Sequence, residues 1–243
     1  MVEDIESVLA LETRLDEHQQ KKNKIVQERD IDGFFHPSAI GNCTKKLWYA
    51  FASHEPRHNI PTKLRYTFGH GHAVHDWMQR EFEDILCGLV DDDWTFTFDA
   101  EISIRDPLYA NSFAEDMHLA GRTDGLITCT HQDGRVYRVI YELKTASDSS
   151  FSRISKPQEA HVRQASIYAH CFDADVIVFQ YYNKNSDISK FFYVPKNETA
   201  LNDVKEQLGK VLDHMSAGTT PDTTSNRWEC RTCPYYHDCR PET

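Results

Sequence analysis

Two charged residues, Glu142 and Lys144, close a mostly apolar stretch over residues 135–145. The alternation in this stretch predicts a β-strand, so Glu142 and Lys144 project from one face while Tyr141 and Leu143 project from the other. A carboxylate can hold a cation, and an ammonium can meet developing negative charge, so the pair predicts a metal-assisted hydrolase. The alternative is a surface ion pair on an edge strand, which contributes only about 0–1 kcal/mol to stability.

A second carboxylate, Asp124, lies in the segment that precedes this strand. A hairpin between the two segments would bring Asp124 and Glu142 together, although an Asp flanked by glycines is by itself more often a turn former. Two carboxylates and a main-chain carbonyl are hard oxygen ligands that suit Mg²⁺ or Mn²⁺. A histidine could add a nitrogen ligand and favour Mn²⁺. The candidates are His70, His72 and His75, which fall within about one and a half helical turns.

Gln164 and Tyr168 are spaced four residues apart in a segment with helical character, so they share one helix face. From that face they could hold a water molecule, Lys144 or a phosphate group. Taken alone, this pair is a weak signal.

The bulk composition narrows the class of protein. The chain has 243 residues, 40% of them hydrophobic, and a formal net charge of −11, which disfavours a simple nucleic-acid coating protein. The sequence contains no run of eighteen apolar residues, so we expect no membrane span. The first residues lack the pattern of a signal peptide, so we expect a cytoplasmic protein. No phosphate-binding loop of the nucleotide-hydrolysing type is present.

Positive charge gathers locally between Cys43 and His75, where Glu55 is the only acidic residue. Aromatic residues are interleaved there, and cations with aromatic faces suit single-stranded nucleic acid. An aromatic core with solvated lysines explains the same pattern equally well. The candidate nucleic-acid contacts are Lys45, Lys46, Arg57, Lys63 and Arg65 in this segment, and Arg122 beside Asp124.

Three of the seven cysteines, Cys230, Cys233 and Cys239, crowd into the last fourteen residues. An odd total without a secretory signal argues against a disulfide framework. Three thiolates this close need a fourth ligand, and the spacing alone does not separate an iron–sulfur cluster from a zinc site, for which His237 is also a candidate. We expect Cys87, Cys129 and Cys171 to be isolated buried thiols.

The remaining patterns predict an α/β protein with a mixed sheet. Residues 1–35 form an N-terminal helical arm, 36–217 a core with a helical insertion, and 218–243 a linker and cysteine tail. Helices are expected from near Pro37 and Ser38, over 68–86, over 157–172 and over 196–216. Strands are expected over 94–104, over 119–128 with Asp124 inside it, over 135–145 after an Asp133-Gly134 turn, over 175–182 and over 190–194.

Several of these motifs together resemble the PD-(D/E)XK nuclease superfamily. The motifs, in chain order, are Gly71-x-x-x-His75, Gly121-Arg-Thr-Asp124, Glu142-Leu-Lys144 and Gln164-x-x-x-Tyr168. Their order is similar to the RecB-type exonucleases, and the cysteines are similar to the iron–sulfur members, which include CRISPR-associated exonucleases and standalone phage relatives. Thr123 departs from the family pattern, which has Pro before Asp124. The N-terminal arm has no counterpart in the family.

The resemblance implies a restriction-endonuclease-like core and assigns roles to these residues. His75, Asp124, Glu142 and the carbonyl of Leu143 would bind Mg²⁺ or Mn²⁺, Lys144 would be the catalytic lysine, and Gln164 and Tyr168 would support them. Cys43 would join Cys230, Cys233 and Cys239 on a 4Fe–4S cluster, with zinc the less favoured occupant. Such a cluster would clamp the ends of the core together and would be structural.

The implied function is a metal-dependent DNA exonuclease that acts on single strands or DNA ends. The compact layout favours a phage enzyme of DNA recombination, which would work in the host cytoplasm. One alternative is a nuclease that trims DNA ends within a CRISPR spacer-acquisition complex. Another is a DNA-binding module without catalysis, against which the intact Asp124, Glu142 and Lys144 argue.

Overall fold

The computed structural model describes residues 33–52, 54, 62–89, 91–109, 112–223, 227–231 and 233–240. The arm expected over residues 1–35 therefore lies outside the described residues as far as residue 32, and so does Arg57. Of the helices in these ranges, none has the length and hydrophobicity that crossing a membrane requires.

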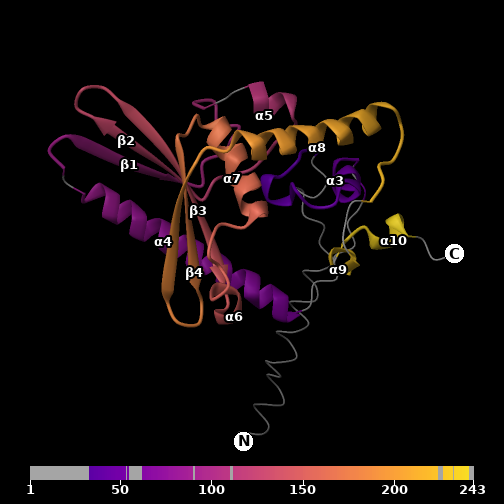
Figure 1. Cartoon of the computed structure of the whole chain (residues 1–243), viewed down its shortest axis with the longest axis horizontal. Coiled ribbons are helices and arrows are strands. Elements are labelled where there is room, and N and C mark those ends of the chain that lie inside the picture. The colour runs from indigo at the N-terminus through magenta and orange to yellow at the C-terminus, as the bar shows by residue number, and fades with distance from the viewer. Residues whose placement is uncertain are drawn as a thin grey trace, which may run out of the picture.

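Strands and helices are interspersed through the middle of the chain (Figure 1). The strands are β1 (Trp94–Ala100), β2 (Gly125–His131), β3 (Val136–Ala146), β4 (Val176–Asn183) and β5 (Ile188–Pro195). The longer helices are α3 (Thr44–Phe51), α4 (Thr62–Cys87), α7 (Glu159–Cys171) and α8 (Glu198–Ser216). The short helical segments are η2 (Pro37–Ala39), α5 (Ser112–Asp116), α6 (Asp148–Phe151), α9 (Arg227–Cys230) and α10 (Tyr236–Cys239).

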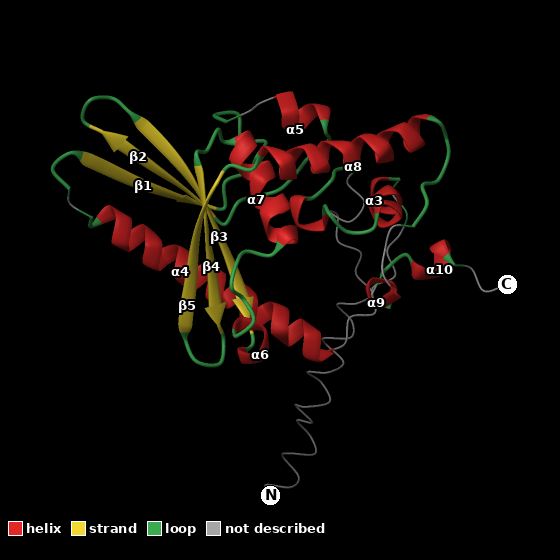
Figure 2. Ribbon diagram, in the orientation of Figure 1, coloured by secondary structure: helices red, strands yellow, loops and turns green. Residues whose placement is uncertain are grey.

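The five strands form one mixed sheet in the order β1-β2-β3-β4-β5. Figure 2 shows the strands in yellow and the helices around them in red. Neighbours pair antiparallel except β3 and β4, which are parallel. Parallel strands need a crossover connection, and here it contains α6 and α7. The structure confirms the predicted α/β class, the mixed sheet and the turn at Asp133-Gly134, where Gly134 has φ 92°.

The two faces of the sheet bury different clusters, and β3 contributes to both. Tyr141 and Leu143 pack with Val74 of α4 on one face. Ile140 and Ala146 belong to the larger cluster on the other face, with α7 and α8. Since Glu142 and Lys144 alternate with Tyr141 and Leu143, they lie on the α7 side, inside a well-packed core.

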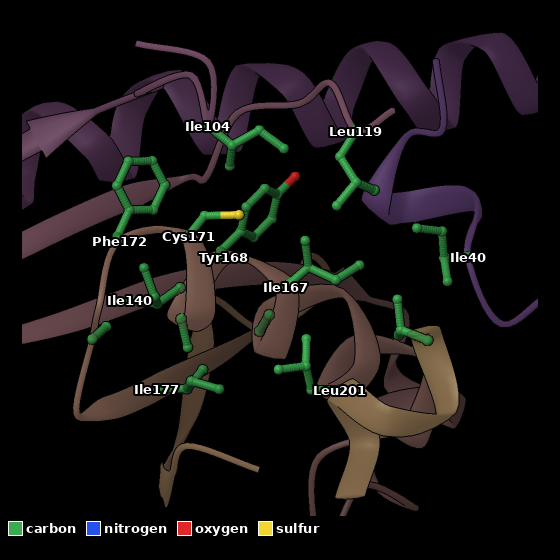
Figure 3. Close-up of a cluster of buried hydrophobic side chains, with 14 of the residues drawn as sticks. Ile40, Ile104, Leu119, Ile140, Ile167, Tyr168, Cys171, Phe172, Ile177 and Leu201 are labelled. Carbon is green, nitrogen blue, oxygen red and sulfur yellow. The ribbon is translucent and has the colours of Figure 1, made fainter. Parts of the chain in front are cut away.

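Figure 3 shows part of this larger cluster, with the Tyr168 ring among Ile104, Leu119 and Ile167. The Tyr168 hydroxyl points toward the side on which Ile104 and Leu119 lie. A helix residue from α7 therefore reaches the connection that leads from β1 to β2.

The structure corrects several predicted boundaries. Pro37 and Ser38 open a short 3₁₀ turn instead of a helix, and α4 begins at Thr62, earlier than expected. The strand expected over 94–104 ends at Ala100, because Glu101 adopts a left-handed backbone with φ 53° that breaks the ladder. The strand expected over 119–128 begins only at Gly125, so Asp124 precedes it instead of lying inside it.

At the start of β2, the absence of a side chain at Gly125 lets the rings of Phe98 and Tyr141 pack close to the backbone. A Cβ atom at Gly125 would lie 2.3 Å from Cε2 of Phe98 and 3.3 Å from Cδ1 of Tyr141. Gly125→Ala should therefore lower the free energy of unfolding by about 1–3 kcal/mol, the usual effect of overpacking a core. Urea denaturation measures this. Gly209→Ala in α8 is the matched control, because no atom lies within 4 Å of its added Cβ. An equal loss in both variants would contradict the packing argument.

Candidate active site

Glu142 and Lys144 form a buried ion pair on β3. Lys144 Nζ donates to Glu142 Oε1, with side-chain exposures of 22% and 0% respectively. Burial raises the pKa of Glu142 while the charge of Lys144 opposes that rise. Burial lowers the pKa of Lys144, but the charges of Glu142 and Asp124 outweigh it and the net pKa is raised, so the ammonium stays protonated.

The second oxygen of Glu142 is the unusual feature of this pair. Among the described residues, buried Oε2 has no hydrogen-bond partner. A buried carboxylate is costly unless cations or donors satisfy it, and Lys144 satisfies only one of its oxygens. The free oxygen is a place for a cation.

Asp124 lies directly beside this pair. The pairing of Gly125 with Tyr141 at the end of the β2–β3 ladder puts Asp124 next in register opposite Glu142. Asp124 Oδ2 accepts a hydrogen bond of 2.7 Å from the Leu143 amide. The two carboxylates predicted from the sequence therefore converge on one end of the hairpin.

Helix α4 supplies the histidine. His75 Nδ1 lies 3.3 Å from Asp124 Oδ1. Burial alone would lower the pKa of His75, but the hydrogen bond and charge of Asp124 outweigh it and the pKa is raised. Of the three clustered histidines, His70 and His72 are exposed.

One turn further along α4, Gln79 contacts the same aspartate. Its Nε2 donates to the Asp124 carbonyl and to Glu101 Oε1, both at 2.9 Å. The sequence prediction missed both residues. Gln79 could have been found from its i+4 spacing to His75, whereas nothing local marks Glu101.

Helix α7 covers the other side of the site with the predicted Gln164 and Tyr168. Tyr168 is 3% exposed, and its burial raises the pKa of the phenol well above the ordinary value. The charges of Glu142 and Asp124 also raise this pKa, and a hydrogen bond from Gln164 opposes the rise. A Cβ atom at Gly121 would lie 3.2 Å from the Tyr168 hydroxyl, so this hydroxyl abuts the segment that leads to Asp124.

A histidine and a tyrosine that the sequence prediction missed lie beside Lys144. Tyr181 is the cross-strand partner of Lys144, and its hydroxyl lies 2.8 Å from His161 Nδ1. The same hydroxyl accepts from the Gln158 amide at 3.0 Å. Burial lowers the pKa of His161 to about 4, assisted by the charge of Lys144, so His161 is neutral at pH 7.

The arrangement of these side chains bears on whether they can bind a divalent metal ion. Within the described ranges no three His, Cys, Asp or Glu side chains stand in ready metal-site geometry. The side chains instead satisfy one another: His75 contacts Asp124, and Lys144 contacts Glu142. The unpartnered Glu142 Oε2, two converging carboxylates and an adjacent imidazole fit a hard cation with some nitrogen affinity.

The comparison with known families agrees with this geometry. The model of the PD-(D/E)XK nuclease superfamily matches residues 28–240. The chain belongs to the PD-(D/E)XK nuclease superfamily. No curated protein sequence matches it significantly.

Solved structures are similar to this superfamily member at low sequence identity. The alkaline exonuclease LHK-Exo from Laribacter hongkongensis has a TM-score of 0.52 and 11% identity, over 79% of this chain and 94% of that one. LHK-Exo in complex with dAMP has a TM-score of 0.51 and 11% identity, over 79% and 93%. SSO0001 has a TM-score of 0.47 and 13% identity, over 93% and 94%. The five-stranded mixed sheet flanked by helices matches the restriction-endonuclease-like fold.

A second candidate site of this PD-(D/E)XK protein lies around the cysteines. A cavity of about 20 Å³ is lined by Cys43 together with Cys230, Cys233 and Cys239. Burial raises the pKa of the Cys233 thiol, and the neighbouring Cys43 and Cys239 also raise it, while Lys46 opposes them. His237, the rival zinc ligand, is exposed and is not among the residues that line this cavity.

The walls of this cavity join segments that are far apart in the chain. Glu229 Oε1 accepts from the Cys43 amide at 2.9 Å, and the Tyr49 hydroxyl donates to the Asp238 carbonyl at 3.0 Å. The rings of Tyr49 and Tyr235 stack with centroids 5.5 Å apart. In Figure 1, α3, α9 and α10 accordingly lie together at one end of the molecule. The four cysteines thus line one small cavity, although among the described residues no three of them stand in ready metal-site geometry.

The remaining cysteines stand apart from this cavity. Cys171 is buried and Cys129 is half-buried, but Cys87 is exposed, so the expectation that all three are buried was wrong for Cys87. Cys87 is the last residue of α4.

The residues predicted to contact nucleic acid lie on different parts of the structure. Lys45 and Lys46 line the cysteine cavity. Lys63 is exposed and Arg65 half-buried in the first turns of α4, the helix that carries His75. Arg122 is exposed, two residues before Asp124.

Proposed function

We propose that the protein is a Mg²⁺- or Mn²⁺-dependent DNA exonuclease that acts on single strands or DNA ends. The observation that carries the proposal is the convergence of Asp124 and Glu142 beside Lys144, with one oxygen of Glu142 left without a partner. His75, Asp124, Glu142 and the Leu143 carbonyl would hold the cation. When bound, the cation would supply the Lewis acid that activates water and neutralises phosphate charge.

The protein residues would prepare the site for phosphodiester cleavage. The protonated Lys144 offers a fixed positive charge to the phosphate group as negative charge develops on it. Tyr181 and neutral His161 flank this ammonium, so neither of them adds a positive charge beside Lys144. The buried surroundings strengthen each of these electrostatic contacts.

The proposed substrate is supported by the surface of α4 and by one relative. Tyr66 and Phe68 are 46% and 48% exposed on the helix that carries His75, with exposed Lys63 beside them. Exposed rings with neighbouring cations suit the stacking of unpaired bases. The relative LHK-Exo is an alkaline exonuclease that has been solved with dAMP. Lys45, Lys46, Arg57, Arg65 and Arg122 remain proposed DNA contacts.

We also propose that Cys43, Cys230, Cys233 and Cys239 hold a structural 4Fe–4S cluster. The proposal is supported by the cavity that the four cysteines share. Since the contacts around the cavity join α3 to the tail, the cluster would hold α3 in place rather than take part in hydrolysis.

A nuclease assay with matched DNA substrates tests the exonuclease proposal. Protein purified without oxygen should degrade free-ended single strands in Mn²⁺ or Mg²⁺, and EDTA should stop this degradation. Circular single strands and strands blocked at both ends should survive. Glu142→Gln should be inactive, because it removes the charged ligand. Equal cutting of circular and linear strands would reject exonuclease action, and unchanged degradation by Glu142→Gln would reject the site.

A further inference from the structure

A third acidic residue, Glu101, lies in line with the two carboxylates of the proposed site. The β1–β2 register continues past the end of the ladder to an isolated bridge between Ser103 and Arg122. This register places Glu101 directly opposite Asp124, which is in turn opposite Glu142. The negative charge of Glu101 also contributes to the raised pKa of Tyr168.

The backbone of Glu101 is held in an unfavourable conformation. Its φ of 53° lies in the left-handed region, where a side chain other than glycine crowds the following carbonyl. Such conformations persist only where surrounding contacts fix them, and they concentrate at functional sites. The contact that fixes the Glu101 side chain is the hydrogen bond of 2.9 Å from Gln79.

Gln79 uses its amide group to join Glu101 to Asp124. The residue is 8% exposed, and its two amide hydrogens serve two acceptors, the Glu101 carboxylate and the Asp124 carbonyl. With one bond alone the amide could rotate, but two acceptors on different segments fix its orientation. The Asp124 main chain is thereby anchored from α4.

Helix α4 therefore contacts Asp124 twice within one turn. His75 approaches the carboxylate and Gln79 holds the carbonyl of the same residue. Asp124 precedes β2 and lacks the regular ladder bonds of a strand residue. Its carboxylate direction thus depends on the Leu143 amide, His75 and the Gln79–Glu101 pair.

We infer that Gln79 and Glu101 are positioning residues that hold Asp124 in the geometry required to bind the divalent cation. The inference rests on the proposed function, because it assumes that Asp124 is a metal ligand. It extends the site to two residues that would touch neither metal nor DNA. Groups that orient metal ligands typically contribute about 10–100-fold to metal affinity.

The test is the Mn²⁺ affinity of the full-length protein, measured from the electron paramagnetic resonance signal of free Mn²⁺. Gln79→Leu removes both hydrogen bonds and should weaken Mn²⁺ binding about 10-fold. Glu101→Ala should weaken it similarly, since Gln79 loses the acceptor that fixes its orientation. Glu101→Gln keeps an oxygen acceptor without the charge and should stay within about threefold of wild type.

Each outcome separates this inference from the proposed site. Asp124→Asn should lose most Mn²⁺ affinity, and an unchanged affinity there would reject the metal site and the inference together. Loss in Asp124→Asn with wild-type affinity in Gln79→Leu and Glu101→Ala would reject the inference alone. Equal losses in Glu101→Gln and Glu101→Ala would also overturn it, because charge instead of positioning would explain them.

Two controls exclude a general effect on the fold. Asp99→Ala removes an exposed acid from β1, two residues before Glu101, and it should bind Mn²⁺ as wild type does. Thermal unfolding reports whether the buried Gln79→Leu variant is folded. If it is not, the exposed Glu101 provides the decisive pair of variants.

Discussion

Lys144→Met is expected to lower the rate of DNA hydrolysis on the order of 10³-fold, since removing one electrostatic contact to a transition state has effects of about this size. Lys144 is the only cation paired with Glu142 among the described residues, and its ammonium is fixed on the same face of β3. Methionine keeps most of the apolar stem of lysine and removes the charge. The measurement is kcat on single-stranded DNA at saturating Mn²⁺.

The Lys144→Met variant should still bind Mn²⁺, which distinguishes Lys144 from the proposed metal ligands. Mn²⁺ affinity should match or exceed that of wild type, because the cation no longer competes with an ammonium for Glu142. Glu142→Gln should lose both activity and Mn²⁺ binding. A Lys144→Met protein that retains activity within tenfold of wild type would remove Lys144 from the proposed chemistry.

The stability of Lys144→Met needs control, because the variant leaves a buried carboxylate without its partner. Removing one member of a buried ion pair destabilises a protein by about 3–5 kcal/mol. Bound Mn²⁺ should restore part of this stability by mass action. Unfolding should therefore be followed with and without Mn²⁺, and rates should be measured where the variant is folded. Lys156→Met, at an exposed position, serves as the matched control.

The second large effect is expected at the cysteine cavity. Cys43→Ser should abolish the bound iron and lower the melting temperature by roughly 10 °C or more. A cross-link that closes so long a loop contributes about 4–5 kcal/mol, and each kcal/mol corresponds to roughly 2–4 °C in a protein of this size. Metal analysis and thermal unfolding of anaerobically purified protein measure the two effects.

Cys87→Ser is the matched control for this substitution, because Cys87 is exposed and is not among the cavity residues. It should keep the iron and the wild-type melting temperature. Zinc in place of iron in the wild-type protein would reject the cluster but keep the tetrathiolate site. A Cys43→Ser protein with unchanged stability and metal content would show that Cys43 is not a ligand.

The sequence was sufficient to predict those parts of the fold that have a regular local pattern. The alternation along β3 placed Glu142 and Lys144 on one face, and the Asp133-Gly134 turn implied the hairpin that brings Asp124 opposite Glu142. The helix expected over residues 157–172 corresponds to α7, which carries Gln164 and Tyr168. These features depend on neighbours in the chain, so a single sequence contains them.

The missed features depend on contacts between distant segments. The strand pairing ends before Glu101 and Asp124, and both residues accept hydrogen bonds from Gln79, which lies 45 residues before Asp124 in the chain. His161 and Tyr181 meet because α7 packs on β4, and they are 20 residues apart. No local preference marks Glu101, His161 or Tyr181, since each of these side chains acquires its partner only when the sheet and helices pack.

The contacts between α3 and the tail have a consequence for the order of folding. The Cys43 amide and the Tyr49 hydroxyl bond to residues that are 186 and 189 positions later in the chain. All five strands lie between them, within residues 94–195, and can pair before the tail has been synthesised. Contacts of such long separation form slowly, because a large loop must close first. During synthesis, α3 therefore lacks these two partners until the tail is made, and the proposed catalytic site can assemble before the contacts between α3 and the tail form.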